Sequence, residues 1–243
     1  MLVLALDTTT RAGSVAVVKD GRVLDLLAGD PRRPHAERVP ADLVRSLERA
    51  GATLADVDAF AVATGPGSFT GLRIGIAAIQ GCAFAAGRPV VGVSALEALA
   101  LAAASDRSER HGMRLGVWMD AQRQEVFSAL YDISGHGPEA RLDPLEGPAV
   151  GDPASTAARW HHLLGGAWCA VTGDGAVRYR QLLSEAAGAP VPVLDPPPLA
   201  ATIALIAERR ACAGEGTLPH AIRPLYVRRS DAELARDRRR AGT

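Results

Sequence analysis

The chain has few of the features that mark secreted or nucleic-acid-binding proteins. Its 243 residues include three cysteines, and aromatic residues make up 4% of the composition. Lysine plus arginine number 27, as do aspartate plus glutamate, so the zero net charge gives no overall electrostatic case for nucleic-acid binding. The cysteines (Cys82, Cys169 and Cys212) are too few and too scattered for a disulfide framework, which favours a reducing compartment.

No signal peptide or membrane-spanning segment is expected. Leu2 leads straight into an apolar strand, without a basic region or a cleavage site before it. The apolar run at 90–104 is interrupted by Glu97 and is too short to span a bilayer. We therefore expect a cytoplasmic protein without membrane contact.

One glycine-rich stretch organises the first part of the chain. Residues 65–75 read GPGSFTGLRIG, after a compact apolar run at 58–64 and before an apolar stretch that continues to Gly87. The run predicts a buried strand, and the later stretch predicts a helix over 70–86, capped by Ser68 or Thr70. The helix is apolar nearly all round, which indicates burial on more than one side.

The glycines of this stretch have two interpretations. A helix N-terminus attracts anions, so the turn could hold a phosphate. No Gly-Lys-Ser/Thr follows, as a Walker loop requires, and Thr70 stands where G-x-G-x-x-G needs its third glycine. A tight turn with close packing is therefore favoured.

The rest of the first 113 residues alternates between strands and helices. Strands are predicted at 2–6, 14–19, 22–27 and 89–93, with a hairpin turn at Asp20-Gly21. One helix is expected from His35 to about residue 50, and another to about residue 104, with Ser94 and Glu97 as a capping box. The polar stretch 105–113 indicates a domain boundary.

The next segment repeats the first. Residues 115–131 lie over 2–18 at a constant offset of 113, which places Asp120 on Asp7. After a Pro/Gly-rich stretch at 135–153, a strand at 167–171, a turn at 173–175 into a helix, a helix at 199–212 and an extended segment at 224–228 are expected. The chain is predicted to be a duplicated α/β protein, with lobes at 1–104 and 105–212 and part of 213–243 packed back on the first lobe.

Two such halves, each with an aspartate at its hairpin, resemble the actin/hexokinase/Hsp70 superfamily, whose fold is actin-like and related to ribonuclease H. Six further motifs narrow the resemblance to the bacterial TsaB (YeaZ) family, between residue 2 and about residue 228. They are LALDTTT, GPGSFTGLRIG, GVSALEALA, MDAQRQEVFSALY, TGDGA and PLYVR, with HAE at 35–37. Ala36, Gln122 and Gln124 depart from the usual residues of that family.

The resemblance implies a non-catalytic scaffold without a cofactor. It would support the catalytic paralogue TsaD and the ATPase TsaE in adding threonylcarbamoyl to adenosine 37 of tRNA, and it would meet tRNA only through the complex. The paralogue binds metal through an H-x-x-x-H helix, whose ligand positions fall here on Ala95 and Leu99. Neither side chain has a lone pair to donate, so a pseudo-enzyme without metal or catalytic residues is expected. The same two residues also argue against a metalloprotease of the glycoprotease type, because such an enzyme would need metal ligands at these positions.

The alternative is a small actin-like ATPase or kinase that uses Asp7 and Asp120. Such enzymes resemble one another in a D-x-G-T hairpin, whose glycine lets phosphate approach the backbone. Thr9 stands at that position here. Because aspartate readily caps turns through its own backbone, turn capping is favoured over nucleotide contact for both residues. Asp174, between two glycines, has the same expected role.

A partner surface is expected on two helices. Small residues recur along the glycine-rich helix and would let another helix approach closely, and without its partner the surface could pair with a second copy of the chain. The competing interpretation is that this small ridge packs inside the first lobe. The predicted interface residues are His35, Glu37, Val39, Leu43, Leu47, Gly71, Gly75, Ala78, Cys82 and Ala85.

Overall fold

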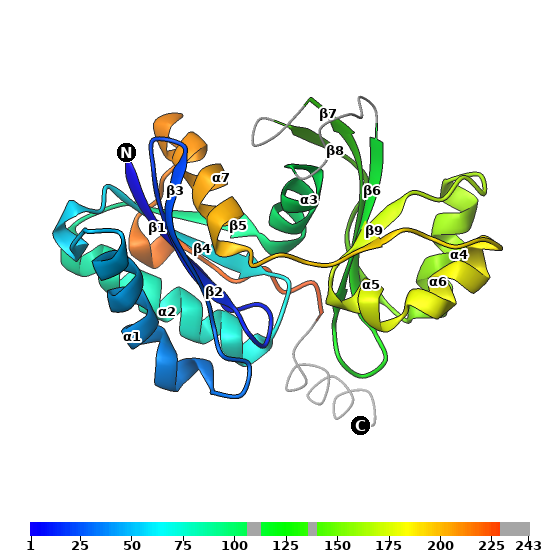
Figure 1. Ribbon diagram of the computed structural model, residues 1–243, viewed down its shortest axis with the longest axis horizontal. Coiled ribbons are helices and arrows are strands. Elements are labelled where there is room, and N and C mark those ends of the chain that lie inside the picture. Colours follow the sequence, from blue (N-terminus) through cyan, green and yellow to red (C-terminus); the bar gives the residue numbers. More distant parts are fainter. Residues whose placement is uncertain (106–112, 136–139, 229–243) are drawn as a thin grey trace, which may run out of the picture.

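The computed structural model describes residues 1–105, 113–135 and 140–228 and has two lobes, each built on a sheet (Figure 1). Most of the boundary expected at 105–113 and the tail beyond Arg228 lie outside the described residues.

The first sheet has five strands in the order β3-β2-β1-β4-β5. Its first three strands are antiparallel neighbours, while β4 and β5 run parallel to β1. Asp20 and Gly21 both have positive φ, as a tight hairpin turn between β2 and β3 requires. The strands are β1 (Leu2–Asp7), β2 (Ser14–Lys19), β3 (Arg22–Ala28), β4 (Ala59–Gly65) and β5 (Val90–Ser94).

The second sheet repeats this topology in the order β8-β7-β6-β9-β10, which confirms the predicted duplication. The prediction that residues 115–131 match residues 2–18 without a gap is wrong by one residue, however. Asp7 pairs with Ser14 across the first hairpin, whereas Asp120 pairs with Val126 across the second, so the second turn is one residue shorter. The strands are β6 (Met113–Asp120), β7 (Val126–Ser134), β8 (Arg141–Gly151), β9 (Ala170–Thr172) and β10 (Val193–Leu194).

Strand β8 corrects the sequence interpretation, which expected only a Pro/Gly-rich stretch at 135–153. The strand contains Pro144 and Pro148, residues that cannot donate to a ladder. It is an edge strand of its sheet, and its register against β7 is irregular on both sides of Leu130. Edge position and irregular register are the conditions under which proline is tolerated in a strand.

Helices cover both faces of each sheet (Figure 1). Helices α1 (His35–Arg49) and α2 (Phe69–Ala86) cover the outer face of the first sheet, and α3 (Ala95–Ser105) and α7 (Ala200–Cys212) lie between the lobes. The far side of the second sheet carries α4 (Pro153–Leu163), α5 (Asp174–Arg178) and α6 (Arg180–Ala187). Short 3₁₀ turns are formed by η1 (Leu54–Asp56) and η3 (Pro219–Ala221).

The two lobes share one hydrophobic core cluster. It joins Val3 and Ala61 of the first sheet to Val117 of the second, with α3 and α7 between them. Helix α7 packs on β1, β2 and β4, although the sequence assigned it to the second lobe with the rest of 105–212. Position along the chain therefore does not match position in space for this helix.

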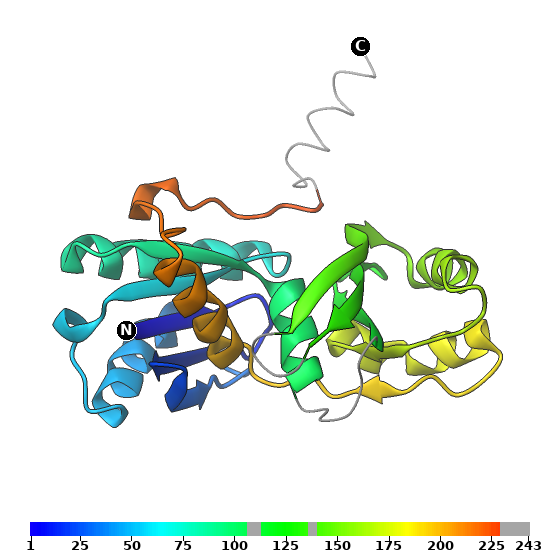
Figure 2. The same cartoon turned by 90° about the horizontal axis from the view of Figure 1, so that it is seen from above.

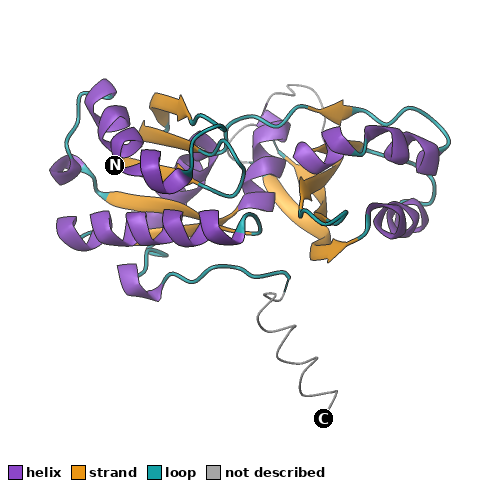
Figure 3. Ribbon diagram, turned by 90° about the horizontal axis from the view of Figure 1, so that it is seen from below, coloured by secondary structure: helices purple, strands orange, loops and turns teal. Residues whose placement is uncertain are grey.

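Residues 217–228, here named the C-terminal strap, run beside α2 from the first lobe to the second (Figures 2 and 3). Thr217 pairs with Val90, and the Gln80 side chain donates to the Pro219 carbonyl at 2.8 Å. The Leu225 amide donates to the Thr64 carbonyl at 2.7 Å. The strap then reaches the second lobe, where Arg228 donates to the Ala121 carbonyl and to Glu125.

Candidate functional site

A cleft of about 960 Å³ lies where the two hairpin turns meet the start of α2 and the end of the strap. Both lobes contribute to its walls. The first hairpin provides Thr9 to Arg11, and the second provides Asp120 to Gln122. Other parts of the wall come from 31–35, 66–69, Leu72, Arg73, Phe127, Asp174 and 225–228.

The glycine-rich stretch positions α2 by close packing. A Cβ on Gly71 would lie 2.2 Å from the Thr8 carbonyl oxygen, and one on Gly75 would lie 2.2 Å from the Thr8 hydroxyl. A Cβ on Gly65 would lie 2.8 Å from the Leu225 carbonyl oxygen. The packing interpretation of these glycines is therefore confirmed: they admit the first hairpin and the strap. Ser68 is the cap, since its Oγ accepts from the Gly71 amide at 3.2 Å.

The Asp7 carboxylate accepts hydrogen bonds within its own turn. Its Oδ1 accepts from the Thr9 amide at 2.8 Å and from the Thr9 hydroxyl at 2.6 Å. The side chain is 2% exposed and does not line the cleft. Burial raises the pKa of Asp7 above its ordinary value, although both hydrogen bonds from Thr9 act in the opposite direction.

Asp120 caps the second hairpin in a similar way. Its Oδ1 accepts from the Gln122 amide at 2.9 Å, and its Oδ2 accepts from Arg178 at 2.7 Å. Asp174 accepts from the Asp120 amide at 2.9 Å and from the Gly175 amide at 3.0 Å, and burial raises the pKa of Asp174. All three carboxylates are thus engaged in holding turns, the role that the sequence favoured over nucleotide contact.

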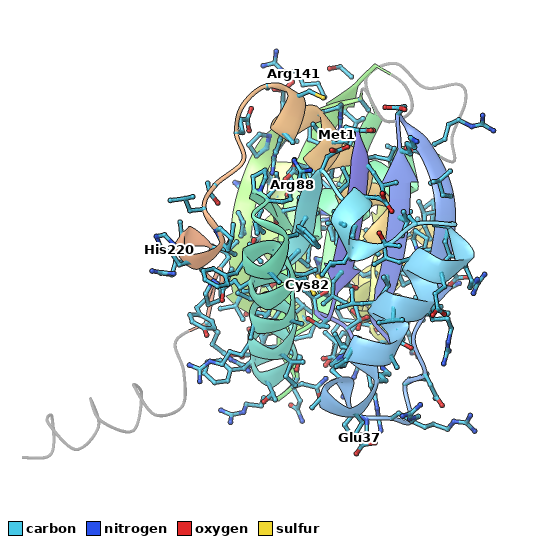
Figure 4. The ribbon with its side chains drawn as sticks, turned by 90° about the vertical axis from the view of Figure 1, so that its left-hand side faces the viewer. Met1, Glu37, Cys82, Arg88, Arg141 and His220 are labelled. Atoms are coloured by element: carbon cyan, nitrogen blue, oxygen red, sulfur yellow. The ribbon has the colours of Figure 1, made fainter. Side chains whose placement is uncertain are left out.

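His35 joins α1 to the first hairpin rather than extending into solvent. Its Nε2 lies 3.0 Å from the Thr10 carbonyl, which can only accept, so Nε2 donates and Nδ1 accepts from Arg38 at 2.8 Å. Burial, with the neighbouring Arg38 charge, lowers the pKa of His35, which keeps the ring neutral. Glu37, in contrast, is exposed at the start of α1 (Figure 4).

Several of the predicted interface residues are buried inside the first lobe. Val39, Leu43 and Leu47 belong to the chain's own core, and Gly71 and Gly75 are buried against Thr8. These five residues pack inside the first lobe, whereas His35 is half-buried and lines the cleft. The physical reason is that the apolar stripe of α1 and the glycine ridge of α2 face their own sheet and hairpin.

The exposed apolar residues of α1 and α2 are different ones. Phe84 is 80% exposed and Val44 is 56% exposed, while Ala85 is exposed and Ala78 and Cys82 are half-buried. Figure 4 looks onto these two helices side by side. The sequence did carry a signal: Val44 breaks the polar side of α1, and Phe84 stands outside both stripes of α2.

Three residues that the sequence analysis did not assign to a site form a stack at the mouth of the cleft. The Arg73 guanidinium lies 4.0 Å from the Phe69 ring centroid, and the Phe69 and Tyr226 rings are 5.3 Å apart. Arg73 Nε also donates to the Tyr226 hydroxyl at 3.1 Å. Phe69 and Arg73 belong to the glycine-rich motif, and Tyr226 belongs to PLYVR. The sequence motifs therefore contained all three residues but did not indicate that they are in contact.

Ala95 and Leu99, which the sequence resemblance placed on the metal-ligand positions of the paralogue, are buried on α3. Within residues 1–105, 113–135 and 140–228, no group of three or more histidines, cysteines and carboxylates could hold a metal ion.

Helix α2 is long and apolar enough, by length and composition alone, to cross a membrane, and a third of it is buried within the molecule. Core helices of soluble proteins pass the same test.

Comparison with known proteins shows which family this chain resembles. The family model TsaD, tRNA N6-adenosine threonylcarbamoyltransferase, matches residues 30–161. The tRNA threonylcarbamoyladenosine biosynthesis protein TsaB of Escherichia coli is 39% identical over 137 residues, which cover 56% of this chain and 58% of that protein.

Solved structures give the same result over a longer span. YeaZ from Pseudomonas aeruginosa superposes with a TM-score of 0.74 and 31% identity, covering 93% of this chain and 99% of that one. Component A of (R)-2-hydroxyglutaryl-CoA dehydratase from Acidaminococcus fermentans superposes with a TM-score of 0.52 at 14% identity, a likeness of fold alone. The duplicated actin-like fold predicted from the sequence is confirmed.

Proposed function

Because this chain belongs to the TsaB/YeaZ family, within the wider family of tRNA N6-adenosine threonylcarbamoyltransferases, we propose that it takes part in making threonylcarbamoyladenosine in tRNA. Its role is that of a non-catalytic scaffold that binds the catalytic paralogue TsaD and, with it, the ATPase TsaE. The chain needs no cofactor of its own and acts in the cytoplasm.

The absence of ligand side chains at two positions supports the non-catalytic role. By the sequence resemblance, Ala95 and Leu99 fall where the paralogue carries its metal-binding histidines, and both side chains are packed into the core. A metal bound there would need a lone pair and an open coordination position, which neither residue provides. Transfer of the threonylcarbamoyl group to adenosine 37 therefore belongs to the partner.

The exposed apolar face of α1 and α2 is the observation that carries the proposal. We define the α1–α2 face as Val44, Ala78, Cys82, Phe84 and Ala85. A phenylalanine of α2 that is 80% exposed and an exposed valine of α1 are typical of a surface that another protein covers. Two helices from a paralogous lobe would close it about a pseudo-twofold axis, and a second copy of this chain would do so when the partner is absent.

The test is to measure binding of purified TsaD by Phe84→Arg and Val44→Arg variants. Both side chains are already exposed, so the charge should leave the fold intact while weakening partner binding at least about tenfold. Leu163→Arg in α4 is the matched control, because Leu163 is 48% exposed but lies on the second lobe.

Sedimentation of the same three proteins alone reports self-association. We expect Phe84→Arg and Val44→Arg to be monomers, with Leu163→Arg pairing like the wild type. A Phe84→Arg variant that is folded and still binds TsaD with wild-type affinity would contradict the α1–α2 face as the partner surface.

A further inference from the structure

Positive charge gathers at the cleft although the whole chain is neutral. The wall contains five arginines and two aspartates. One of the aspartates, Asp120, is paired with Arg178, and the other, Asp174, accepts two backbone amides. The excess of positive charge is therefore a local property, which the zero net charge of the sequence conceals.

Three of the arginines form no ion pair with a carboxylate among the described residues, although the charge of one of them, Arg33, acts on Asp30. Arg11 donates to the Pro31 carbonyl at 3.0 Å, and Arg73 meets only Phe69 and Tyr226. The Arg33 side chain makes no hydrogen bond or ion pair within the part of the chain that the structure describes. Guanidinium groups placed this way remain free to bind phosphate oxygens through paired N–H donors.

Aromatic rings lie beside these charges. Phe69 is 40% exposed and Tyr226 is 43% exposed, and both residues line the cleft. Exposed rings next to arginines are the arrangement by which proteins bind single-stranded nucleic acid, with bases stacked on the rings and phosphates on the cations.

We propose that the mouth of the cleft binds single-stranded RNA, with a base on the Phe69–Tyr226 ring pair and the backbone phosphates against Arg11, Arg33 and Arg73. The inference rests on the proposed function, because it assigns to this chain a direct contact with the RNA that the complex modifies. It goes beyond that function in that the scaffold itself, without its partner, should bind an RNA strand.

The distribution of the arginines favours a strand over a free nucleotide. Arg11 comes from the first hairpin, Arg33 from the loop before α1, and Arg73 from α2. The hairpin turn that could hold a polyphosphate has Thr9 in place of glycine and is filled by the Asp7–Thr9 hydrogen bonds. Cations from several elements suit successive phosphates along a chain.

The test measures binding by fluorescence anisotropy of a labelled 12-nucleotide single-stranded RNA to the full chain. Arg33→Gln should weaken binding several-fold and reduce the slope of log affinity against log salt by about 0.7, the value for one lost phosphate contact. Arg88→Gln is the matched control. It removes the same charge just beyond the opposite end of α2, where Arg88 is exposed (Figure 4).

The ring is tested separately. Tyr226→Leu should weaken binding at least about fivefold, whereas Tyr226→Phe, which keeps the ring and loses only the hydroxyl that accepts from Arg73, should weaken it less. Arg33→Gln removes no side-chain hydrogen bond or ion pair within the described chain, so it stays informative if Tyr226→Leu loosens the strap.

Three results would overturn the RNA site. They are no binding of the RNA by the wild type, equal binding by Arg33→Gln and Arg88→Gln, and binding of ATP in place of the strand. Binding of TsaD by the same variants separates this proposal from the proposed function. An Arg33→Gln variant that binds TsaD normally but RNA poorly supports the RNA site. The Phe84→Arg and Val44→Arg variants, which should lose TsaD binding, should still bind RNA like the wild type.

Discussion

At the scale of single residues, the aspartates of the two hairpins show how one side chain can resemble a catalytic group and yet serve a turn. Asp7 accepts two hydrogen bonds from Thr9 and is 2% exposed. A carboxylate that coordinates Mg²⁺ needs oxygens open to the cleft. The threonine at position 9 was the residue in the sequence that indicated this outcome.

Replacing Asp7 by asparagine tests this role through the pH dependence of stability. Burial raises the pKa of Asp7 in the folded state above the ordinary value of 3.8, so the folded state holds the proton more tightly. This contribution to stability is complete below about pH 4 and is lost as the pH rises through the folded-state pKa. Asp7→Asn cannot ionise, and its Oδ1 can still accept from Thr9.

We therefore expect the unfolding free energy of Asp7→Asn, relative to wild type, to increase with pH above about 4 and then to become constant. Urea denaturation between pH 4 and 8 measures it. A difference that does not vary with pH would show that Asp7 has an ordinary pKa.

At the scale of elements, the contact between α2 and the first hairpin depends on the absence of side chains. A Cβ on Gly71 would lie 2.2 Å from the Thr8 carbonyl oxygen, whereas a Cβ on Gly81 of the same helix meets nothing within 4 Å. We expect Gly71→Ala to destabilise the fold by about 1–3 kcal/mol through overpacking. Gly81→Ala should stabilise it by about 0.5–1 kcal/mol, because alanine is the better helix former. Thermal melting of the two variants decides, and equal effects would contradict the packing role.

Most elements could be predicted because their residues follow the period of a strand or helix, but contacts between distant segments could not. Strand β8 was missed because its prolines are tolerated only at an edge, a property of the sheet rather than of the segment. In the site, Asp120 was found from its motif, as was Asp7 of the neighbouring turn. The ring pair was not, because Phe69 and Tyr226 are far apart in the chain and meet only where the strap passes α2.

The same limit applied to the partner surface. Val39, Leu43 and Leu47 form the apolar stripe of α1, and a stripe of that kind packs on the protein's own core as readily as on a partner. Exposure of Val44 and Phe84 separates the two cases, and exposure depends on how α1 and α2 pack on the sheet.

At the scale of the whole molecule, the lobes are interlocked rather than consecutive. Helix α7 follows the second lobe in sequence but packs on the first sheet, and the strap returns from the first lobe to Glu125 of the second. Because α3 and α7 join both sheets in one core cluster, neither lobe keeps a complete core without the other. We therefore expect the described chain to unfold as a single cooperative unit.

Ile203→Ala tests this cooperativity, since Ile203 of α7 is fully buried in the shared cluster. Loss of its side chain should cost about 2–5 kcal/mol. All three tryptophans (Trp118, Trp160 and Trp168) lie in the second lobe, so tryptophan fluorescence reports that lobe alone, whereas far-UV circular dichroism reports both. The two melting curves should coincide in the wild type and shift together in Ile203→Ala. If the lobes unfolded independently, a lesion in α7, which packs on β1, β2 and β4, would lower the dichroism midpoint and leave the fluorescence midpoint where it was.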